Sequence, residues 1–155
     1  MATTNPDSVP ASLSDATAAN AAVVVRLWDE AFNQGALEVL AELVHPEFTN
    51  FGQPTNGPQF LARLISAQRA AFPDMRFTIL QAFAAGDWIL TKARWAGTFV
   101  GPFPFLGLDG VAPTGRRFAV DHVHGFRLHD GKIAEHWAVR DDLTMHNQLL
   151  GGVSA

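Results

Sequence analysis

The sequence predicts an α+β protein in which a strongly curved antiparallel sheet wraps around N-terminal helices. Two observations predict this class: apolar residues recur at helical spacing up to about residue 71, and at a spacing of two after Pro73. Helices that precede a long antiparallel sheet pack on one of its faces. A sheet that curves strongly around them forms a cone-shaped barrel with one open mouth, a shape that the sequence permits. Residues 1–13 are predicted to be a disordered tail and residues 14–155 a single domain.

Three helices are predicted before the strands. In "ATAANAAVVVRLWDEAFNQG" apolar residues recur at helical spacing, and Gly35 ends the helix. The segment "ALEVLAELVHP" predicts a second, short helix that Pro46 ends. The following "EFTNFGQPTNG" is predicted to be a loop, and a third helix runs from Pro58 to about Ala71.

Two hairpins follow the helices. "MRFTILQAFAAGDWILTKARWAGTFV" predicts two strands joined around Gly86, and "RRFAVDHVHGFRLHDGKIAEHWAVR" predicts two more joined around Asp130-Gly131. The connection between the hairpins, "GPFPFLGLDGVAPTG", is long and apolar, whereas loops normally carry polar residues. Its phenylalanines and leucines therefore predict either a lid over a pocket or a subunit contact, with equal weight.

Four of the six histidines lie in "DHVHGFRLHDGKIAEHW", among residues that belong in a core. Alternation along a strand puts His122 and His124 on the apolar, inward face. A three-residue turn at 129–131 places His124 opposite His136 and His122 opposite Ala138, whereas a two-residue turn turns His136 to the other face. We favour the three-residue turn, because both inward rows then share one cavity that the small Ala138 leaves open.

The segments "LWDEAFNQGALEVLAELVHPEF", "GPQFLARLISAQRAAFPDMRFTI", "GVAPTGRRF" and "HGFRLHDGKIAEHW", followed by "RDDL" and "NQLLG", resemble, in this order, the SnoaL-like polyketide cyclases, a family with the nuclear transport factor 2-like fold. The resemblance covers about residues 22 to 151. It implies a cone with a deep apolar pocket, no cofactor, and homodimers or higher homo-oligomers formed through the outer face of the sheet. It also implies an intramolecular aldol step on a polyketide ester, in which a carboxylate moves the proton.

The resemblance assigns individual residues as well. His124 matches the pocket histidine of the penultimate strand, His122 matches a position where a glutamine contacts the ligand, and Asn50 matches the pocket asparagine. The acid/base aspartate of the cyclases lies two residues after the "EH" histidine, where this chain has Ala138. A methyl group transfers no proton, so another group must act if the protein is an enzyme.

We therefore expect a cofactor-free cyclase, isomerase or lyase that acts on a small apolar, polyketide-like carbonyl compound by histidine-assisted acid–base chemistry. The candidate catalytic residues are His136, His124 and, as the nearest carboxylate to the vacated position, Asp141. Arg140 is expected either to bind a substrate oxyanion or to form an ion pair at the rim. The full set of predicted substrate-binding residues is His122, Asn50, Trp28, Phe32, Trp95, Phe99, Phe126, Ala138 and Arg140.

Three other interpretations of the histidines stay open. They can be core residues that hydrogen-bond to one another or to the backbone. His122, His124 and His136 also match a three-histidine metal site of the kind that zinc uses, although the resemblance implies no metal. Finally, the loss of the usual aspartate at Ala138 fits a pocket that binds a small molecule without chemistry.

Charge and composition exclude several classes of function. The net charge is −4 and no basic stripe is present, which excludes nucleic acid as a partner. No apolar run approaches the ~18 residues of a membrane span, and the N-terminus lacks the features of a secretory signal. With no cysteine, disulfides and thiol catalysis are excluded. We expect a cytoplasmic protein whose partners are a small apolar organic ligand and further copies of itself.

Overall fold

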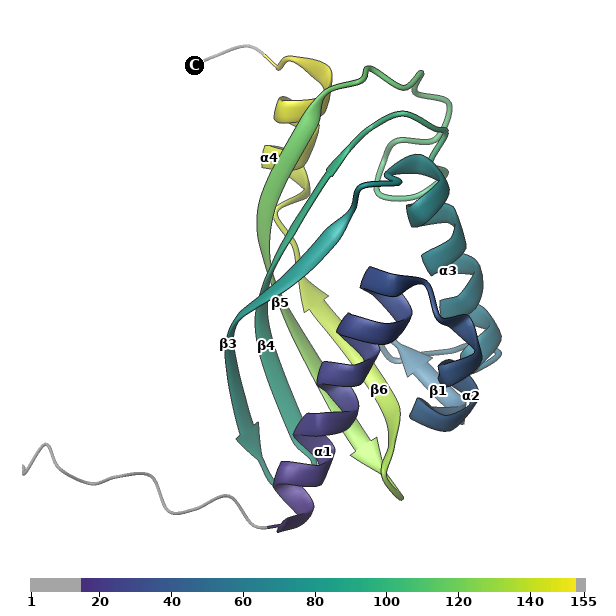
Figure 1. Cartoon of the computed structure of the whole chain (residues 1–155), viewed down its shortest axis with the longest axis vertical. Helices are drawn as coiled ribbons and strands as arrows, with labels where there is room; N and C mark the ends of the chain where they lie inside the picture. Colours follow the sequence, from purple (N-terminus) through teal and green to yellow (C-terminus); the bar gives the residue numbers. More distant parts are fainter. Residues whose placement is uncertain (1–14, 153–155) are drawn as a thin grey trace, which may run out of the picture.

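Helices come first and long strands afterwards in the computed structural model, which describes residues 15–152 (Figure 1). The helical elements are α1 (Asp15–Arg26), its π-helical continuation η1 (Leu27–Gln34), η2 (Leu37–Val39), α2 (Leu40–Leu43), α3 (Pro58–Ala71) and α4 (Asp142–Leu150). The strands are β1 (Val44–Asn50), β2 (Gln53–Pro54), β3 (Arg76–Ala85), β4 (Trp88–Thr98), β5 (Arg117–His129) and β6 (Lys132–Val139). The predicted N-terminal tail lies outside the described residues.

The strands form one six-stranded sheet in the order β2-β1-β6-β5-β4-β3. All neighbours are antiparallel except β1 and β6, which are parallel. The long strands bend along their length, and α1 and α3 lie against the same side of the sheet (Figure 1). The predicted α+β class is thus confirmed, but the sheet is not a closed barrel, because β2 and β3 are its two edges.

The first and third predicted helices are confirmed, and their ends have the expected local causes. The first ends at Gly35, which takes the left-handed conformation (φ 77°) that other residues avoid. The third begins at Pro58, whose missing N–H costs nothing in the first turn. None of the helices within residues 15–152 is long and apolar enough to span a membrane.

The segment after the second helix differs from the prediction. Helix α2 ends at Leu43, so β1 begins within the predicted second helix and continues into the predicted loop, which also contains β2. Pro46 does not end a helix but lies within β1, where the pairing with β6 is irregular between Val44 and Thr49. A proline is tolerated in such a place because no ladder hydrogen bond needs its N–H. Helix α4, at the other end of the chain, has no counterpart in the prediction.

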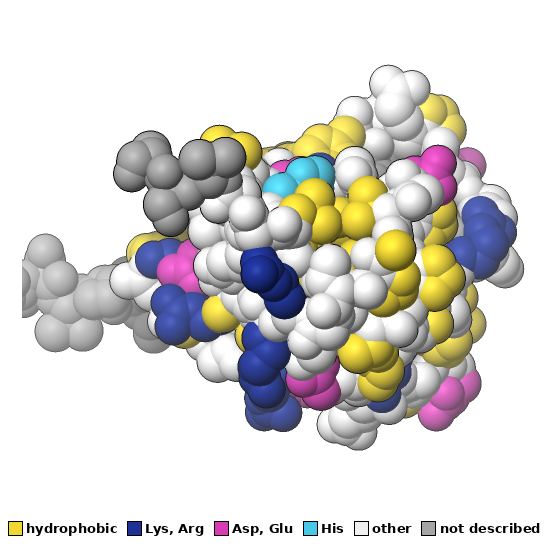
Figure 2. All heavy atoms as spheres, turned by 90° about the horizontal axis from the view of Figure 1, so that it is seen from above, with side chains coloured by type: hydrophobic (Ala, Val, Ile, Leu, Met, Phe, Trp, Pro, Cys, Tyr) yellow, Lys and Arg dark blue, Asp and Glu magenta, His cyan; other side chains and the backbone are white. Residues whose placement is uncertain are grey.

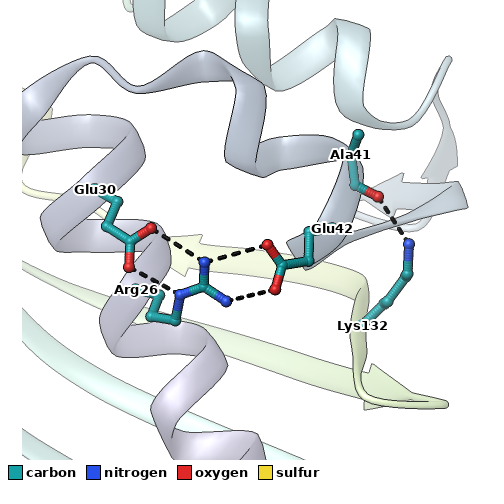
Figure 3. A network of polar contacts seen from close by, with 5 residues as sticks. All are labelled: Arg26, Glu30, Ala41, Glu42 and Lys132. Atoms are coloured by element: carbon teal, nitrogen blue, oxygen red, sulfur yellow. Dashed lines mark hydrogen bonds and ion pairs between the residues drawn. The ribbon is translucent and has the colours of Figure 1, made fainter.

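An exposed polar network holds the helical elements to the sheet (Figure 3). Arg26, at the end of α1, donates hydrogen bonds to both Glu30 in η1 and Glu42 in α2, with Nε to Glu30 Oε1 and Nη1 to Glu42 Oε1 each at 2.8 Å. Lys132, at the start of β6, donates through Nζ to the carbonyl oxygen of Ala41 at 2.7 Å. These contacts tie α1 and η1 to α2, and α2 to the β5–β6 hairpin. Residues of η1 and of both strands of this hairpin line the cavity described below.

An alanine at Gly125 is expected to destabilise the sheet. Gly125 of β5 lies opposite Trp137 of β6, and a Cβ added there would lie 2.2 Å from Cε2 of the Trp137 indole. Because the ring or the strand must then move, we expect Gly125→Ala to lower the free energy of unfolding by about 1–3 kcal/mol, measured by urea denaturation. In a Trp137→Leu background the same change is expected to cost less. An equal loss in both backgrounds would contradict this cause.

Candidate active site

The β5–β6 turn differs from the favoured register. The turn has two residues, Asp130 and Gly131, both with positive φ (48° and 73°), and His129 pairs with Lys132. The predicted three-residue turn is therefore wrong. A two-residue turn with these dihedral angles matches the twist of the strands.

A bulge nevertheless keeps the two histidine rows on one face. Pairing shifts between Arg127 and Leu128, and Ala134 is left without a register partner. The extra residue restores the alternation, so His136 still points inward. It lies opposite Phe126 rather than His124, and His124 lies opposite Ala138.

These inward side chains face a cavity between the sheet and the helices. It encloses about 720 Å³ of space, including its open mouth. Its wall is mostly apolar and aromatic, with a few polar groups, as is typical of small-molecule sites. The lining residues are Leu27, Trp28, Phe32, Phe48, Asn50, Phe51, Phe60, Leu61, Leu64, Gln68, Phe77, Trp95, Phe103, Leu106, His122, His124, Phe126, Ile133, His136, Ala138 and Arg140.

A chain of hydrogen bonds joins three of the polar residues. Asn50 and His136 are register partners in the parallel β1–β6 pair, and Asn50 Oδ1 lies 2.8 Å from His136 Nδ1. His136 Nε2 in turn lies 3.0 Å from His124 Nδ1. An amide oxygen only accepts, so His136 Nδ1 carries a proton and donates it to Asn50. Neutral His136 then accepts at Nε2 from the Nδ1–H of His124, which leaves His124 Nε2 as an unprotonated nitrogen.

Burial keeps all three cavity histidines neutral. Desolvation lowers the pKa of His122 to about 4 and that of His136 to about 4, with a smaller contribution from Arg140 in both cases. Desolvation also holds the pKa of His124 well below its usual range, and the neighbouring His136 adds to this effect. A neutral imidazole with a free lone pair is the form that accepts a proton.

The free nitrogens have no partner within the protein. His122 Nε2 and His124 Nε2 are both buried and neither makes a hydrogen bond. The Trp28 ring packs edge-on against His124, with centroids 4.8 Å apart, and donates its own N–H to Thr91 Oγ1 at 3.4 Å. The His124 imidazole is therefore fixed in orientation, while its Nε2 remains available to a ligand.

Arg140 lies on the outer side of the histidine pair. Its guanidinium lies 5.5 Å from the centroid of the Phe51 ring, and its Nη2 is 3.2 Å from Asp142 Oδ2. Phe51 is 47% exposed and packs against His136. Arg140 thus lines the cavity near solvent and also forms the ion pair that we considered as its alternative role.

Two of the predicted site residues do not line the cavity. Phe99 is buried in the core against Phe72, with ring centroids 5.5 Å apart. The Asp141 carboxylate caps α4 and accepts a hydrogen bond from the backbone N–H of Thr144 at 3.0 Å. Hydrogen bonding by the Thr144 side chain and then by its backbone N–H holds the pKa of Asp141 below its usual range, so the carboxyl is ionised and already hydrogen-bonded. The cap explains its position, because β6 ends just before α4 begins.

The other predicted residues reach the cavity, and some lining residues have no counterpart in the prediction. Trp28 and Phe32 line it from η1, whose π-helical winding is a feature often found at functional sites. Gln68 was missed, although it carries a readable signal. It is the one polar residue in the buried series Leu61, Ile65 and Gln68 on α3, spaced as one helical face.

The long apolar connection forms part of the wall. Phe103 and Leu106 line the cavity, and Leu106 is held by a hydrogen bond from His146 Nε2 of α4 to its carbonyl oxygen at 2.5 Å. Phe105 of the same connection and Val100, the residue just before it, are exposed. Viewed from above, hydrophobic side chains gather on this end of the molecule, which carries α4 and the β4–β5 connection (Figures 1 and 2). A wall or lid over the pocket and a subunit contact are both compatible with this placement.

The three-histidine metal arrangement is not formed. Within residues 15–152 no three histidine, aspartate or glutamate side chains are grouped so that they hold a metal ion. His124 and His136 instead direct ring nitrogens at one another. Asp121, the acid nearest to His122 in the sequence, pairs with Arg94 and Lys92 on the outward face.

Comparison with known proteins shows which family this chain resembles. The sequence model of the SnoaL-like polyketide cyclases matches residues 22–149. The aklanonic acid methyl ester cyclase DnrD of Streptomyces peucetius is 31% identical over 132 residues, 81% of this chain and 88% of that protein. The nogalonic acid methyl ester cyclase of Streptomyces nogalater is 32% identical over 111 residues, 68% and 79% of the two chains. The structure of TsrD from Streptomyces laurentii has a TM-score of 0.75 at 26% identity, covering 84% of this chain and 94% of TsrD.

Proposed function

Since the chain belongs to the SnoaL-like polyketide cyclase family, we propose that it is an enzyme that needs no cofactor and removes a proton from a small, polyketide-like carbonyl compound. The single observation that supports this proposal is the unpaired, unprotonated His124 Nε2 in the cavity wall. The relatives of this chain in Streptomyces peucetius and Streptomyces nogalater are methyl ester cyclases. The proposed substrate class is therefore an aromatic polyketide methyl ester.

In the proposed reaction His124 Nε2 is the general base. It takes a proton from the carbon between a ketone and the ester carbonyl, and the electron pair of that C–H bond forms an enolate. His124 becomes an imidazolium whose Nδ1–H bond to His136 is then charge-assisted and stronger. His136 and Asn50 are positioning residues, because they fix the tautomer and the orientation of the base.

The remaining steps use groups on the same wall. His122, in its Nε2–H tautomer, donates to the enolate oxygen, as the matched glutamine is implied to do in the cyclases. The enolate carbon attacks a second carbonyl carbon of the same molecule, and a C–C bond closes the ring. The new alkoxide takes its proton back from His124, so the base is regenerated and no oxidant or reductant is needed.

The position of Ala138 supports the proposal that histidine replaces the family's carboxylate. Ala138 is the register partner of His124 and lines the cavity. With a methyl group there, the substrate carbon has room to approach the imidazole instead of a carboxylate. The same residue favours the second candidate function, a pocket that binds the ligand without chemistry.

Deuterium incorporation into aklanonic acid methyl ester tests the proposal and separates it from the second candidate. We expect the protein in D₂O to speed exchange at the acidic carbon, measured by NMR, and to form the cyclised product. Because burial lowers the pKa of His124 well below 6.5, its base form persists as the pH falls through that value. The rate is therefore expected to stay level from neutral pH to below pH 6.5, and then to fall about tenfold per pH unit. Binding of the ester without exchange, or a rate that already falls above pH 6.5, would overturn the proposed role of His124.

A further inference from the structure

The cavity wall contains two more buried polar groups without a partner. They are the Oε1 of Gln68 and the Nε1–H of Trp95. The two residues are 7% and 1% exposed, and both line the cavity. Most buried polar groups in proteins are hydrogen-bonded, and an unpaired one destabilises the fold. Two such groups in the wall of one cavity indicate that a ligand supplies their partners.

These groups are connected to each other and to the histidines by short contacts. Gln68 is one turn before Phe72, whose N–H donates to the Gln68 carbonyl oxygen at 2.8 Å, and the Phe72 ring packs on Trp95 at 5.4 Å. Trp95 is also 5.9 Å from His122, measured between ring centroids. The exposed Phe51, by contrast, packs on His136. Trp95 therefore lies beside His122, on the side of the histidines away from Phe51, and Gln68 is connected to it through Phe72.

We propose that Gln68 and Trp95 form a subsite that binds a hydroxyl substituent on an aromatic ring of the ligand. A hydroxyl donates to Gln68 Oε1 and accepts from the Trp95 N–H at the same time, so one group satisfies both. Arg140 is the one lysine, arginine, aspartate or glutamate of the lining, and its guanidinium is already paired with Asp142. A carboxylate beside Gln68 and Trp95 would be desolvated without a free counterion, so the substituent is neutral.

The aromatic side chains that line the cavity support the choice of an aromatic ring in the ligand. The Trp95 indole stacks on Phe77 at an interplanar angle of 4°, and the rings of Phe103 and Trp28 also line the cavity. The orientation of the ligand rests on the proposed function, which places the reacting carbon of the ligand at His124. The hydroxylated ring then lies on the His122 side of His124, toward Trp95, which makes Gln68 and Trp95 specificity residues and not catalytic ones.

Equilibrium binding of naphthol and naphthalene, followed by titration calorimetry, tests the subsite. These probes share one ring system and differ by one hydroxyl. We expect the wild type to bind naphthol about tenfold more tightly, equivalent to about 1.4 kcal/mol. Gln68→Leu and Trp95→Phe are each expected to reduce this ratio to near one, mainly by weakening naphthol. Gln81→Leu, an equal change at an exposed position outside the cavity, is expected to keep the full ratio.

Thermal stability provides a readout that separates binding from structure. Because Gln68→Leu removes an unpaired buried group, we expect Tm to rise by about 2–4 °C. A lowered Tm with an unchanged ratio would instead make Gln68 a structural residue and overturn the subsite. An unchanged ratio of naphthol to naphthalene affinity in Trp95→Phe would show that the indole is not part of the subsite. None of these measurements needs turnover, so a protein that fails to exchange the ester proton but discriminates the probes loses only the proposed function.

Discussion

Replacement of His124 by glutamine is expected to lower kcat for the polyketide ester by about 100- to 10,000-fold, the usual contribution of a general base. Glutamine retains a polar side chain of similar length, and its amide N–H can donate to His136 Nε2 in place of the His124 Nδ1–H. It has no nitrogen that accepts a proton near neutral pH. The loss is therefore expected in kcat, while the Kd for the ester, measured by fluorescence quenching, changes little.

His129→Gln is the matched control for this variant. His129 is on the same strand, β5, but its side chain is 68% exposed and does not line the cavity. We expect it to retain full activity. If His124→Gln keeps more than a tenth of the wild-type kcat, another group is the base.

Asn50 and His136 are proposed to act through His124, and this predicts how an Asn50 substitution combines with His124→Gln. Residues that act as one unit have effects that do not add. Asn50→Leu alone is expected to slow the reaction, because His136 is then free to take the other tautomer and His124 Nε2 can become protonated. In combination with His124→Gln, the same change is expected to have no additional effect on kcat.

The larger features of the fold could be predicted because their signals are local. The helix that Gly35 ends, the helix that Pro58 begins and both hairpins follow from spacing and turn residues. Strand β1 could not be predicted in this way, because Pro46 argues against a strand and its partner β6 is about 90 residues away in the sequence. The bulge at Ala134 could not be predicted either, because nothing in the local sequence shows that an extra residue restores the alternation of side chains.

In the candidate site, too, local sequence patterns predicted some features, and others depend on tertiary structure. Alternation along β5 placed His122 and His124 on the inward face, and the bulge kept His136 with them despite the wrong register. Which nitrogen is free depended on Asn50, whose distance to His136 Nδ1 comes from tertiary structure. Gln68 was missed because one polar residue on an amphipathic helix usually belongs to its solvent face. The roles of these residues stay predictions, as do the homodimer and the cytoplasmic location. For the dimer, the outward register partners Val123 and Val139 are exposed on β5 and β6.

Acidification is expected to destabilise the protein through the same buried histidines. The pKa of His122 is about 4 in the folded protein and about 6.5 in an unfolded chain. Between these values the unfolded chain binds a proton that the folded protein does not, so the free energy of unfolding falls as the pH falls through this window. Below about pH 4 this group contributes no further change. His124 and His136, whose pKa values are also lowered, act in the same direction.

Urea denaturation near pH 7 and near pH 4.5 measures this effect. His122 is 2% exposed, and a shift of this size corresponds to roughly 2 kcal/mol over that interval. His122→Gln, which introduces the residue that the family resemblance implies at this position, is expected to lose about 2 kcal/mol less than the wild type on acidification. The exposed His129→Gln variant is expected to lose as much as the wild type. Equal losses in His122→Gln and the wild type would show that His122 titrates normally, which is incompatible with an imidazole buried and unpaired in the cavity wall.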